Sequence, residues 1–219
     1  MAGAEIPQGF QQIDVKSNEE VVQAVAEKRA LVVVDVQRDF LPGGSLAVPE
    51  GNEVVPVLNE YIQRFKAAGL PIYATRDWHP PVTRHFRQYG GAWPPHCVQG
   101  TPGAEFHPDL RLPDDVIIVS KGMDPNKDSY SSFQAFEADG TDMATSLRKR
   151  GITHIYISGL ATDYCVRNTI LDALREGFQA TVLLDGSFGV NLKPHDSEKA
   201  ITEMVAAGAH MATLNQVKA

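Results

Sequence analysis

The chain has 219 residues, of which 43% are hydrophobic and 21% charged, and its formal net charge is −7. This is enough apolar material for one sizeable core, so we expect a single domain over 17–219, with 1–16 as a tail or strap. The acidic balance, with no basic run longer than 148–150, argues against a nucleic-acid partner. We see no signal peptide and no apolar run of the roughly 20 residues that cross a bilayer, so no membrane association is expected.

Apolar, strand-like runs alternate with segments of helical periodicity along the chain. The runs expected to form strands are 31–36, 70–75, 116–120, 154–158 and 179–184, with a weaker sixth at 209–214. The expected helices are 19–29, 54–68, 142–150, 165–176 and 197–207. Asn18 can cap the first helix, while Gly69 and Gly177 end two others. The alternation predicts an α/β fold with a mostly parallel, six-stranded sheet.

The stretch 155–168, IYISGLATDYCVRN, passes from an apolar strand into a helix. Thr162 or Asp163 can cap that helix, which places Cys165 in its first turn. Unpaired N–H groups and the helix dipole at that position favour a thiolate, and hence a nucleophile for acyl transfer. A buried structural cysteine, which behaves as a small hydrophobe, also fits this stretch.

Three reactive side chains are expected near the carboxyl ends of strands, where sites form in parallel sheets. They are Asp35, Lys121 and Cys165. Lys121 would offset the cost of burying Asp35 in the apolar run LVVVDVQ and would lower the pKa of a nearby thiol. The carboxylate could then shuttle the thiol proton. A buried Asp–Lys ion pair beside an unrelated cysteine is the alternative interpretation.

Residues 76–115 form a long insertion rich in His, Pro, Gly and aromatic residues, and insertions of this length are usually functional. Asp77 and His79 share a face if the chain is extended, so both can reach one ion together with His85 and His96. Histidine nitrogens with one carboxylate suit Zn²⁺ or Fe²⁺ better than Ca²⁺. A surface loop that is merely rich in histidine is the alternative.

Four aromatic residues could line a flat pocket near these groups, although each alone could equally be core packing. They are Phe40, Trp93, Tyr130 and Tyr164. The glycine-rich stretches GLATD and FLPGG lack a phosphate-loop pattern, so no nucleotide site is expected. The two cysteines, Cys97 and Cys165, do not make a disulfide framework, which predicts a reducing, cytoplasmic location.

Six motifs follow one another in a specific order and spacing. They are DVQRDF at 35–40, DWH at 77–79, WPPHCVQGTPGAEFHP at 93–108, KG at 121–122, SYSSF at 129–133 and GLATDYCV at 159–166. In this order they resemble the nicotinamidases, which also act on pyrazinamide, within the isochorismatase-like cysteine hydrolases. The resemblance extends over about residues 30–190, and the WPPHCVQGT segment distinguishes nicotinamidases from metal-free relatives.

The resemblance implies a three-layer α/β/α fold and a catalytic triad of Asp35, Lys121 and Cys165. It implies one divalent metal ion, Zn²⁺ or Fe²⁺ with Mn²⁺ as a further option, bound by Asp77, His79 and His96. His85 lies where some members supply a further ligand and others do not. Arg87 stands where many members carry Ser, which leaves the role of the 84–92 loop open.

The resemblance also implies how a substrate would bind. The Leu160–Ala161 peptide is expected to be cis, with the N–H groups of Ala161 and Cys165 as an oxyanion hole. Phe40 and Trp93 match the aromatic residues that stack on the substrate ring. The other expected pocket residues are Leu160, Tyr164 and, more weakly, Tyr130. Cys97 is expected to be structural.

The implied activity is hydrolysis of nicotinamide to nicotinate and ammonia through a Cys165 thioester, in NAD salvage. The partners are therefore small molecules, nicotinamide and pyrazinamide, and a homo-oligomer stays open. Three alternatives remain at this point. They are another amidase of the superfamily acting on carbamoyl or ureido substrates, an isochorismatase, and an inert domain that binds a ligand or partner.

Overall fold

The computed structural model describes residues 27–217. The expected tail at 1–16 and most of the expected helix at 19–29 therefore lie outside the described residues. The end of that helix is wrong, because Arg29 already opens the strand β1 (Arg29–Val34). Arg29 and Ala30 already pair in parallel with His154 and Ile155 of the neighbouring strand, which a helix at residue 29 would prevent.

Six strands form one sheet in the order β3-β2-β1-β4-β5-β6, and every neighbouring pair is parallel. The strands after β1 are β2 (Ile72–Asp77), β3 (Ile117–Lys121), β4 (His154–Leu160), β5 (Gln179–Phe188) and β6 (His210–Ala212). All six expected strands are confirmed. Because the pairs are parallel, the carboxyl ends of the strands lie at one edge of the sheet, as a site in such a fold requires.

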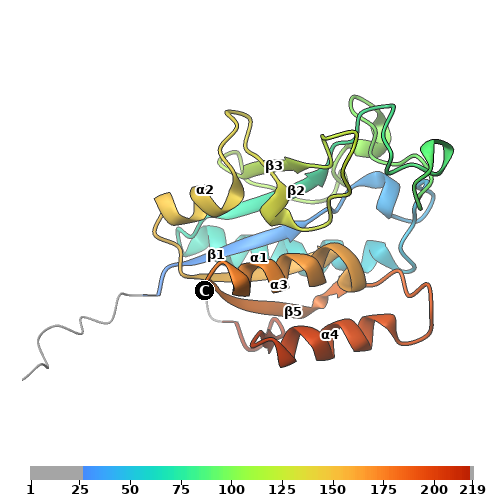
Figure 1. The fold of residues 1–219 in the computed structure, drawn as a ribbon. Coiled ribbons are helices and arrows are strands. Elements are labelled where there is room, and N and C mark those ends of the chain that lie inside the picture. The colour runs from blue at the N-terminus through green and yellow to red at the C-terminus, as the bar shows by residue number, and fades with distance from the viewer. Residues whose placement is uncertain (1–26, 218–219) are drawn as a thin grey trace, which may run out of the picture.

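Helices cover both faces of the sheet, which confirms three layers (Figure 1). Helix α1 (Val54–Ala67) packs on one face, and α2 (Met143–Lys149), α3 (Arg167–Arg175) and α4 (Asp196–Ala206) pack on the other. Alternate residues of β1 enter the two cores: Val32 and Val34 face α2–α4, while Val33 faces α1. Because β1 is buried on both faces, its sequence after the first residue is a continuous apolar run rather than an alternation of apolar and polar residues.

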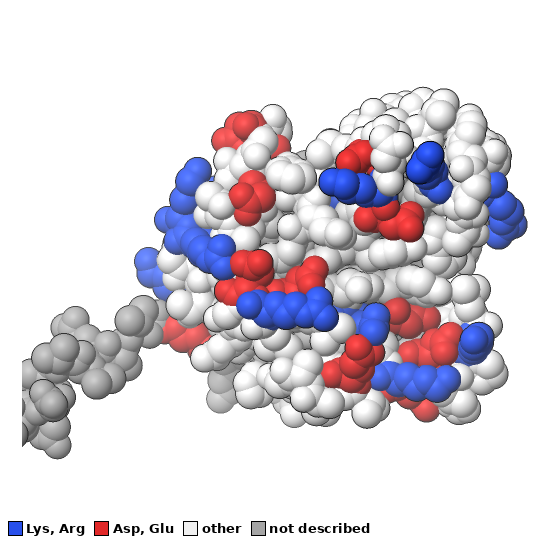
Figure 2. Space-filling model, viewed as in Figure 1, with Lys and Arg blue, Asp and Glu red and all other residues white. Residues whose placement is uncertain are grey.

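The surface around α2, α3 and α4 mixes acidic and basic side chains rather than separating them (Figure 2). Arg148 pairs with Glu176 and Arg167 pairs with Glu203, each at 2.6 Å. Within residues 27–217, no helix combines the length and the apolar character that crossing a membrane requires.

Between β2 and β3 the described chain makes two short 3₁₀ turns, Arg87–Tyr89 and Pro102–Ala104, and otherwise runs irregularly. This confirms the long insertion, except that residues 76 and 77 belong to β2. The insertion lies over the carboxyl edge of the sheet, because backbone bonds join it to the residues after β1. Arg38 N–H donates to Glu105 O at 2.9 Å, and His107 N–H donates to Val36 O at 2.9 Å.

Candidate active site

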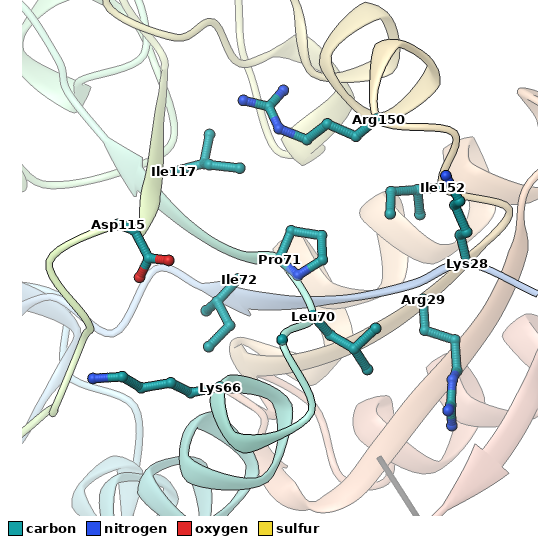
Figure 3. A pocket seen from close by; sticks show the side chains of 11 residues that line it. Lys28, Arg29, Lys66, Leu70, Pro71, Ile72, Asp115, Ile117, Arg150 and Ile152 are labelled. Atoms are coloured by element: carbon teal, nitrogen blue, oxygen red, sulfur yellow. The ribbon is translucent and has the colours of Figure 1, made fainter.

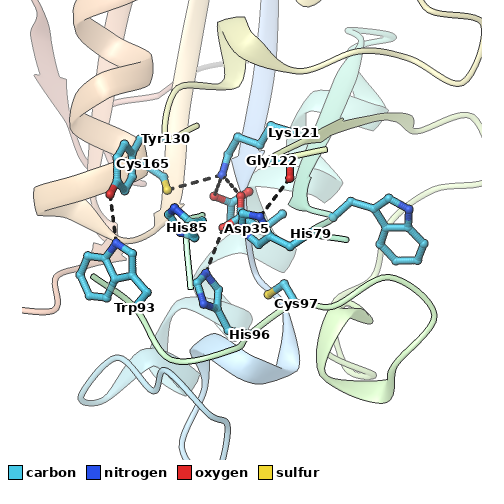
Figure 4. Close-up of polar contacts among 12 residues, drawn as sticks. Asp35, His79, His85, Trp93, His96, Cys97, Lys121, Gly122, Tyr130 and Cys165 are labelled. Carbon is cyan, nitrogen blue, oxygen red and sulfur yellow. Dashed lines mark hydrogen bonds and ion pairs between the residues drawn. The ribbon is translucent and has the colours of Figure 1, made fainter. Parts of the chain in front are cut away.

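Asp35, Lys121 and Cys165 come together at the carboxyl edge of the sheet, as predicted (Figure 4). Lys121 Nζ lies 2.8 Å from Asp35 Oδ2 and 3.6 Å from Cys165 Sγ. Asp35 directly follows β1, and Lys121 is the last residue of β3. Thr75 Oγ1 donates a hydrogen bond of 2.7 Å to the other oxygen of Asp35. All of these side chains are buried, so solvent does not screen their charges.

Cys165 lies in a π-helical turn, Thr162–Val166, that leads directly into α3. The expected cap at Thr162 or Asp163 is wrong, because Ala161 occupies the capping position and no side chain caps this turn. The Asp163 carboxylate instead accepts from the N–H groups of Val190 and Asn191, at 2.9 and 2.7 Å. The Leu160–Ala161 peptide is cis, as expected. The turn therefore presents Cys165 without using the capping residues that the sequence offers.

Burial raises the pKa of the Cys165 thiol well above its usual value, although Lys121 alone would lower it. Desolvation therefore outweighs the nearby positive charge, and the net shift is opposite to the thiolate that the sequence predicts. Burial also raises the pKa of Asp35, against the opposing effect of Lys121. A buried thiol beside a carboxylate of raised pKa is suited to lose its proton only as it attacks.

Three histidines of the insertion converge beside the triad. The ligand atoms of His79, His85 and His96 all lie within 4.8 Å of one another, and all three side chains are buried. Asp77 Oδ2 lies 3.6 Å from His79 Nε2 and 3.7 Å from His96 Nε2. The four residues predicted to bind a metal are thus brought together. The other oxygen of Asp77 contacts Lys121 Nζ, which joins this cluster to the triad.

The hydrogen bonds of these histidines fit a divalent cation. Each Nδ1 has an oxygen acceptor: Gly122 O at 3.0 Å for His79, Pro94 O at 2.8 Å for His96, and Asp128 Oδ1 at 2.6 Å for His85. A proton on each Nδ1 leaves the Nε2 lone pair for a metal. His79 Nε2 is buried without a hydrogen-bond partner among the described residues, as an atom reserved for a metal would be.

The Asp77 carboxyl is the anionic member of this cluster. Burial alone would raise its pKa, but Lys121, His79 and His96 hold it well below its usual value. Burial lowers the pKa of His85, with Asp128 opposing, so its ring favours the neutral form that binds metals. One carboxylate and three imidazoles are a donor set for Zn²⁺ or Fe²⁺.

A cavity with about 390 Å³ of empty space opens between the triad and the histidine cluster. Its lining includes all of the predicted pocket residues: Phe40, Trp93, Tyr130, Leu160, Ala161, Tyr164 and Cys165. Trp93 Nε1 donates to the Tyr130 hydroxyl at 3.0 Å, and the Trp93 ring meets the Tyr164 ring edge-on at 5.1 Å. The cavity is small and lined mainly by apolar and aromatic side chains, which suits a ligand with one ring.

The comparisons with known proteins agree with this fold and site. A model of the isochorismatase domain matches residues 29–216. The chain belongs to the isochorismatase family.

Individual members of the family resemble the chain over most of its length. The nicotinamidase of Escherichia coli is 42% identical over 205 residues, which covers 85% of this chain and 95% of that protein. The pyrazinamidase of Pyrococcus horikoshii, solved in complex with zinc, superposes with a TM-score of 0.79 at 50% identity and covers 85% of this chain and 99% of that one. PnC1 of L. infantum, solved in complex with nicotinate, has a TM-score of 0.76 at 33% identity, with coverage of 86% and 93%.

Two polar residues that sequence reasoning missed hold the site of this isochorismatase-family chain together. The Gln37 side chain clamps the backbone of Asp77: its Nε2 donates to Asp77 O at 2.8 Å and its Oε1 accepts from Asp77 N–H at 2.7 Å. Asp39 Oδ2 accepts from the N–H of Cys97 at 2.7 Å. Both lie in the DVQRDF motif at 35–40, whose likeness to the family was the available signal. Cys97 itself is buried and free.

Three apolar residues of the cavity wall, Leu46, Val48 and Val190, were also missed. A second, larger cavity lies at the amino ends of β1, β2 and β3 (Figure 3), the edge of the sheet opposite to the one that carries Asp35 and Lys121. Leu70, Pro71 and Ile72 are among the apolar residues that line it, with Lys28, Arg29, Lys66 and Arg150 around them. None of the predicted site residues lines it, whereas ten of them line the smaller cavity.

Proposed function

We propose that this protein is a metal-dependent cysteine amidase that hydrolyses nicotinamide to nicotinate and ammonia, and that it also accepts pyrazinamide. The observation that carries the proposal is the arrangement of the smaller cavity. Cys165 forms one part of its wall, and Asp77, His85 and His96 form another, with aromatic side chains around them. A planar ring that bears both a nitrogen and a carboxamide fits this arrangement. The activities of the similar proteins support it.

Binding in this proposal is a matter of orientation. A divalent metal held by Asp77, His79, His85 and His96 would supply a Lewis acid for the ring nitrogen. Phe40 and Trp93 would hold the ring faces, and the Tyr130 hydroxyl fixes the Trp93 indole. Orientation of the carboxamide over Cys165 is worth several kcal/mol of the barrier, because it replaces a bimolecular encounter.

The reaction then proceeds on the residues of the triad. Asp35 accepts the thiol proton as Cys165 Sγ attacks the carboxamide carbon, and Lys121 balances the negative charge. The N–H groups of Ala161 and Cys165 stabilise the oxyanion, an effect worth about 10²–10³ in rate for one donor. Asp35 returns the proton to the leaving ammonia. With Asp35 as base, water hydrolyses the thioester, releases nicotinate and restores the thiol.

The test is ammonia release from nicotinamide by the purified full-length protein, before and after chelation. Release that chelation removes and added Zn²⁺ or Fe²⁺ restores is the expected result. Absence of release from metal-loaded protein overturns the proposal and points to a carbamoyl or ureido substrate, which has no ring nitrogen. Release that survives complete metal removal overturns the role of the metal but keeps the triad.

The proposal also covers the cellular role, the domain organisation and the partners of the protein. We propose a role in NAD salvage in the cytoplasm, and one domain over 17–219 in which the insertion at about 76–115 binds the metal. Small molecules are the partners that this activity implies.

A further inference from the structure

One loop orients two of the three histidines. It covers residues 122–128 and begins directly after Lys121, at the end of β3. Gly122 O accepts from His79 Nδ1 at 3.0 Å, and Asp128 Oδ1 accepts from His85 Nδ1 at 2.6 Å. His96 differs, since its acceptor is the carbonyl of Pro94 two residues away in its own segment. The 122–128 loop therefore connects the triad lysine to the histidine cluster.

The segment that carries His85 is fastened to the same loop through its backbone. Arg84 N–H donates to Pro125 O at 2.8 Å, and Thr83 Oγ1 donates to the same oxygen at 3.3 Å. Thr83 Oγ1 in turn accepts from His85 N–H at 3.2 Å. These backbone contacts hold the His85 segment against the loop without the Asp128 side chain. The bond from Asp128 to the His85 ring is therefore not needed to keep the segment in place, and its effect is on the ring itself.

The acceptor of His85 is unlike the other two. Backbone carbonyls hold His79 and His96, whereas a carboxylate with 62% of its side chain exposed holds His85. A hydrogen bond from imidazole to a carboxylate is charge-assisted, fixes the proton on Nδ1 and makes Nε2 a stronger donor to a metal. His85 otherwise stacks on the His79 ring, with centroids 4.6 Å apart and planes inclined by 16°, a contact that does not select a tautomer.

We propose that Asp128 is a positioning residue that makes His85 a full ligand of the metal centre. It orients the imidazole and strengthens its Nε2 as a donor. Asp128 does not contact the cavity that would hold the substrate, so it acts only through His85. This inference rests on the metal centre of the proposed function and assigns to it a residue from outside the histidine-rich insertion.

The test measures Zn²⁺ affinity of the metal-free full-length protein by competition with a chromogenic chelator. We expect Asp128→Ala to weaken Zn²⁺ binding by about 10–100-fold, the usual cost of losing such a partner. Asp124→Asn is the matched control, because Asp124 lies in the same loop but accepts from Asn126 N–H, at 2.9 Å. Zn²⁺ affinity of Asp124→Asn should stay within about twofold of the unmodified protein. Asp128→Asn, which keeps the shape and loses the charge, should fall between.

A double-mutant comparison separates positioning from a general effect of charge. In a His85→Ala background, adding Asp128→Ala should leave the Zn²⁺ affinity unchanged. A further loss there would show that Asp128 acts through its charge on the whole site and would overturn the inference. The visible spectrum of bound Co²⁺ gives a second readout, since Asp128→Ala should shift it towards that of His85→Ala.

The two proposals fail in different ways. If the unmodified protein binds no Zn²⁺, the metal centre of the proposed function fails. If it binds Zn²⁺ and Asp128→Ala binds it equally tightly with an unchanged Co²⁺ spectrum, only the role of Asp128 fails. Thermal unfolding of the metal-free variants verifies that each is folded before its affinity is compared.

Discussion

Asp35 and Asp77 are the same residue type at the ends of neighbouring strands, and both contact Lys121, yet their pKa values shift in opposite directions. Burial raises the pKa of Asp35, with Lys121 opposing and Thr75 adding one donor. Burial acts on Asp77 as well, but Lys121, His79 and His96 together hold its pKa well below the usual value. The neighbours that favour the charged form therefore separate a carboxyl that can exchange a proton from one that stays ionised: Lys121 and Thr75 act on Asp35, whereas Lys121 and two histidines act on Asp77. Lys121 contacts both carboxylates and so connects the proposed triad with the histidine cluster.

The largest expected effect comes from removing the nucleophile. Cys165→Ala should reduce turnover by at least about 10³-fold, because no other group can form the thioester. Bound metal should be unchanged, since the contact of Cys165 Sγ is with Lys121, at 3.6 Å, rather than with the histidines. Ammonia release and metal content per chain measure the two effects. Loss of metal in this variant would mean that the triad and the histidine cluster are not separable.

Two single substitutions, one at each carboxylate, test whether Asp35 and Asp77 have different roles. Asp35→Asn should lower kcat by about 10²–10⁴-fold, the usual contribution of a general base, and keep the metal. Asp77→Asn should lose metal affinity as well as activity, because it neutralises the one carboxylate 3.6–3.7 Å from two histidine nitrogens. Metal content and kcat of both variants decide the point. Equal metal content in the two would contradict the assignment of Asp77 as the ligand.

The position of the proposed triad was largely predictable, because it depends on where the apolar strands end. The apolar runs at 31–36, 116–120 and 154–158 predict strands of a parallel sheet, and reactive residues at their ends share one edge. The bounds of these three strands differ from the expected ones by up to two residues, because apolar periodicity does not mark where hydrogen bonding stops. The proposed metal ligands follow from residue types in the insertion and from family resemblance, and the structure brings the three histidines together.

What escaped prediction depends on tertiary contacts. Burial raises the pKa of the Cys165 thiol, whereas the local sequence shows only that Cys165 lies near a helix start. Thr162 and Asp163 match a capping pattern, but the Asp163 carboxylate bonds to a loop 27 residues away instead. Asp128 lies 43 residues from His85 in the chain, so no spacing rule connects them.

Removing Lys121 tests how strongly the stability of the fold depends on the one positive charge between Asp35 and Asp77. Lys121→Met leaves the buried carboxylates of Asp35 and Asp77 without their common partner. Breaking a buried ion pair from one side costs about 3–5 kcal/mol, so unfolding by urea should begin at clearly lower concentration. Adding Asp35→Asn to Lys121→Met should recover part of this loss by removing one unpaired charge. No recovery would indicate that Lys121 stabilises the fold by packing alone.

The smallest expected effect is a shift in pH dependence that belongs to Asp35 alone. The base must be deprotonated, so kcat/KM should fall as pH is lowered through the pKa of Asp35, which burial raises above that of an ordinary aspartate. Thr75 Oγ1 donates to the charged form of Asp35 at 2.7 Å and so lowers this pKa. Thr75→Val should therefore move the acid limb to higher pH, and Thr75→Ser, which keeps a hydroxyl, should restore it. Metal content measured at each pH is the control, because acid also protonates the histidines. An acid limb that stays in place in Thr75→Val while metal content is constant would assign the limb to a group other than Asp35.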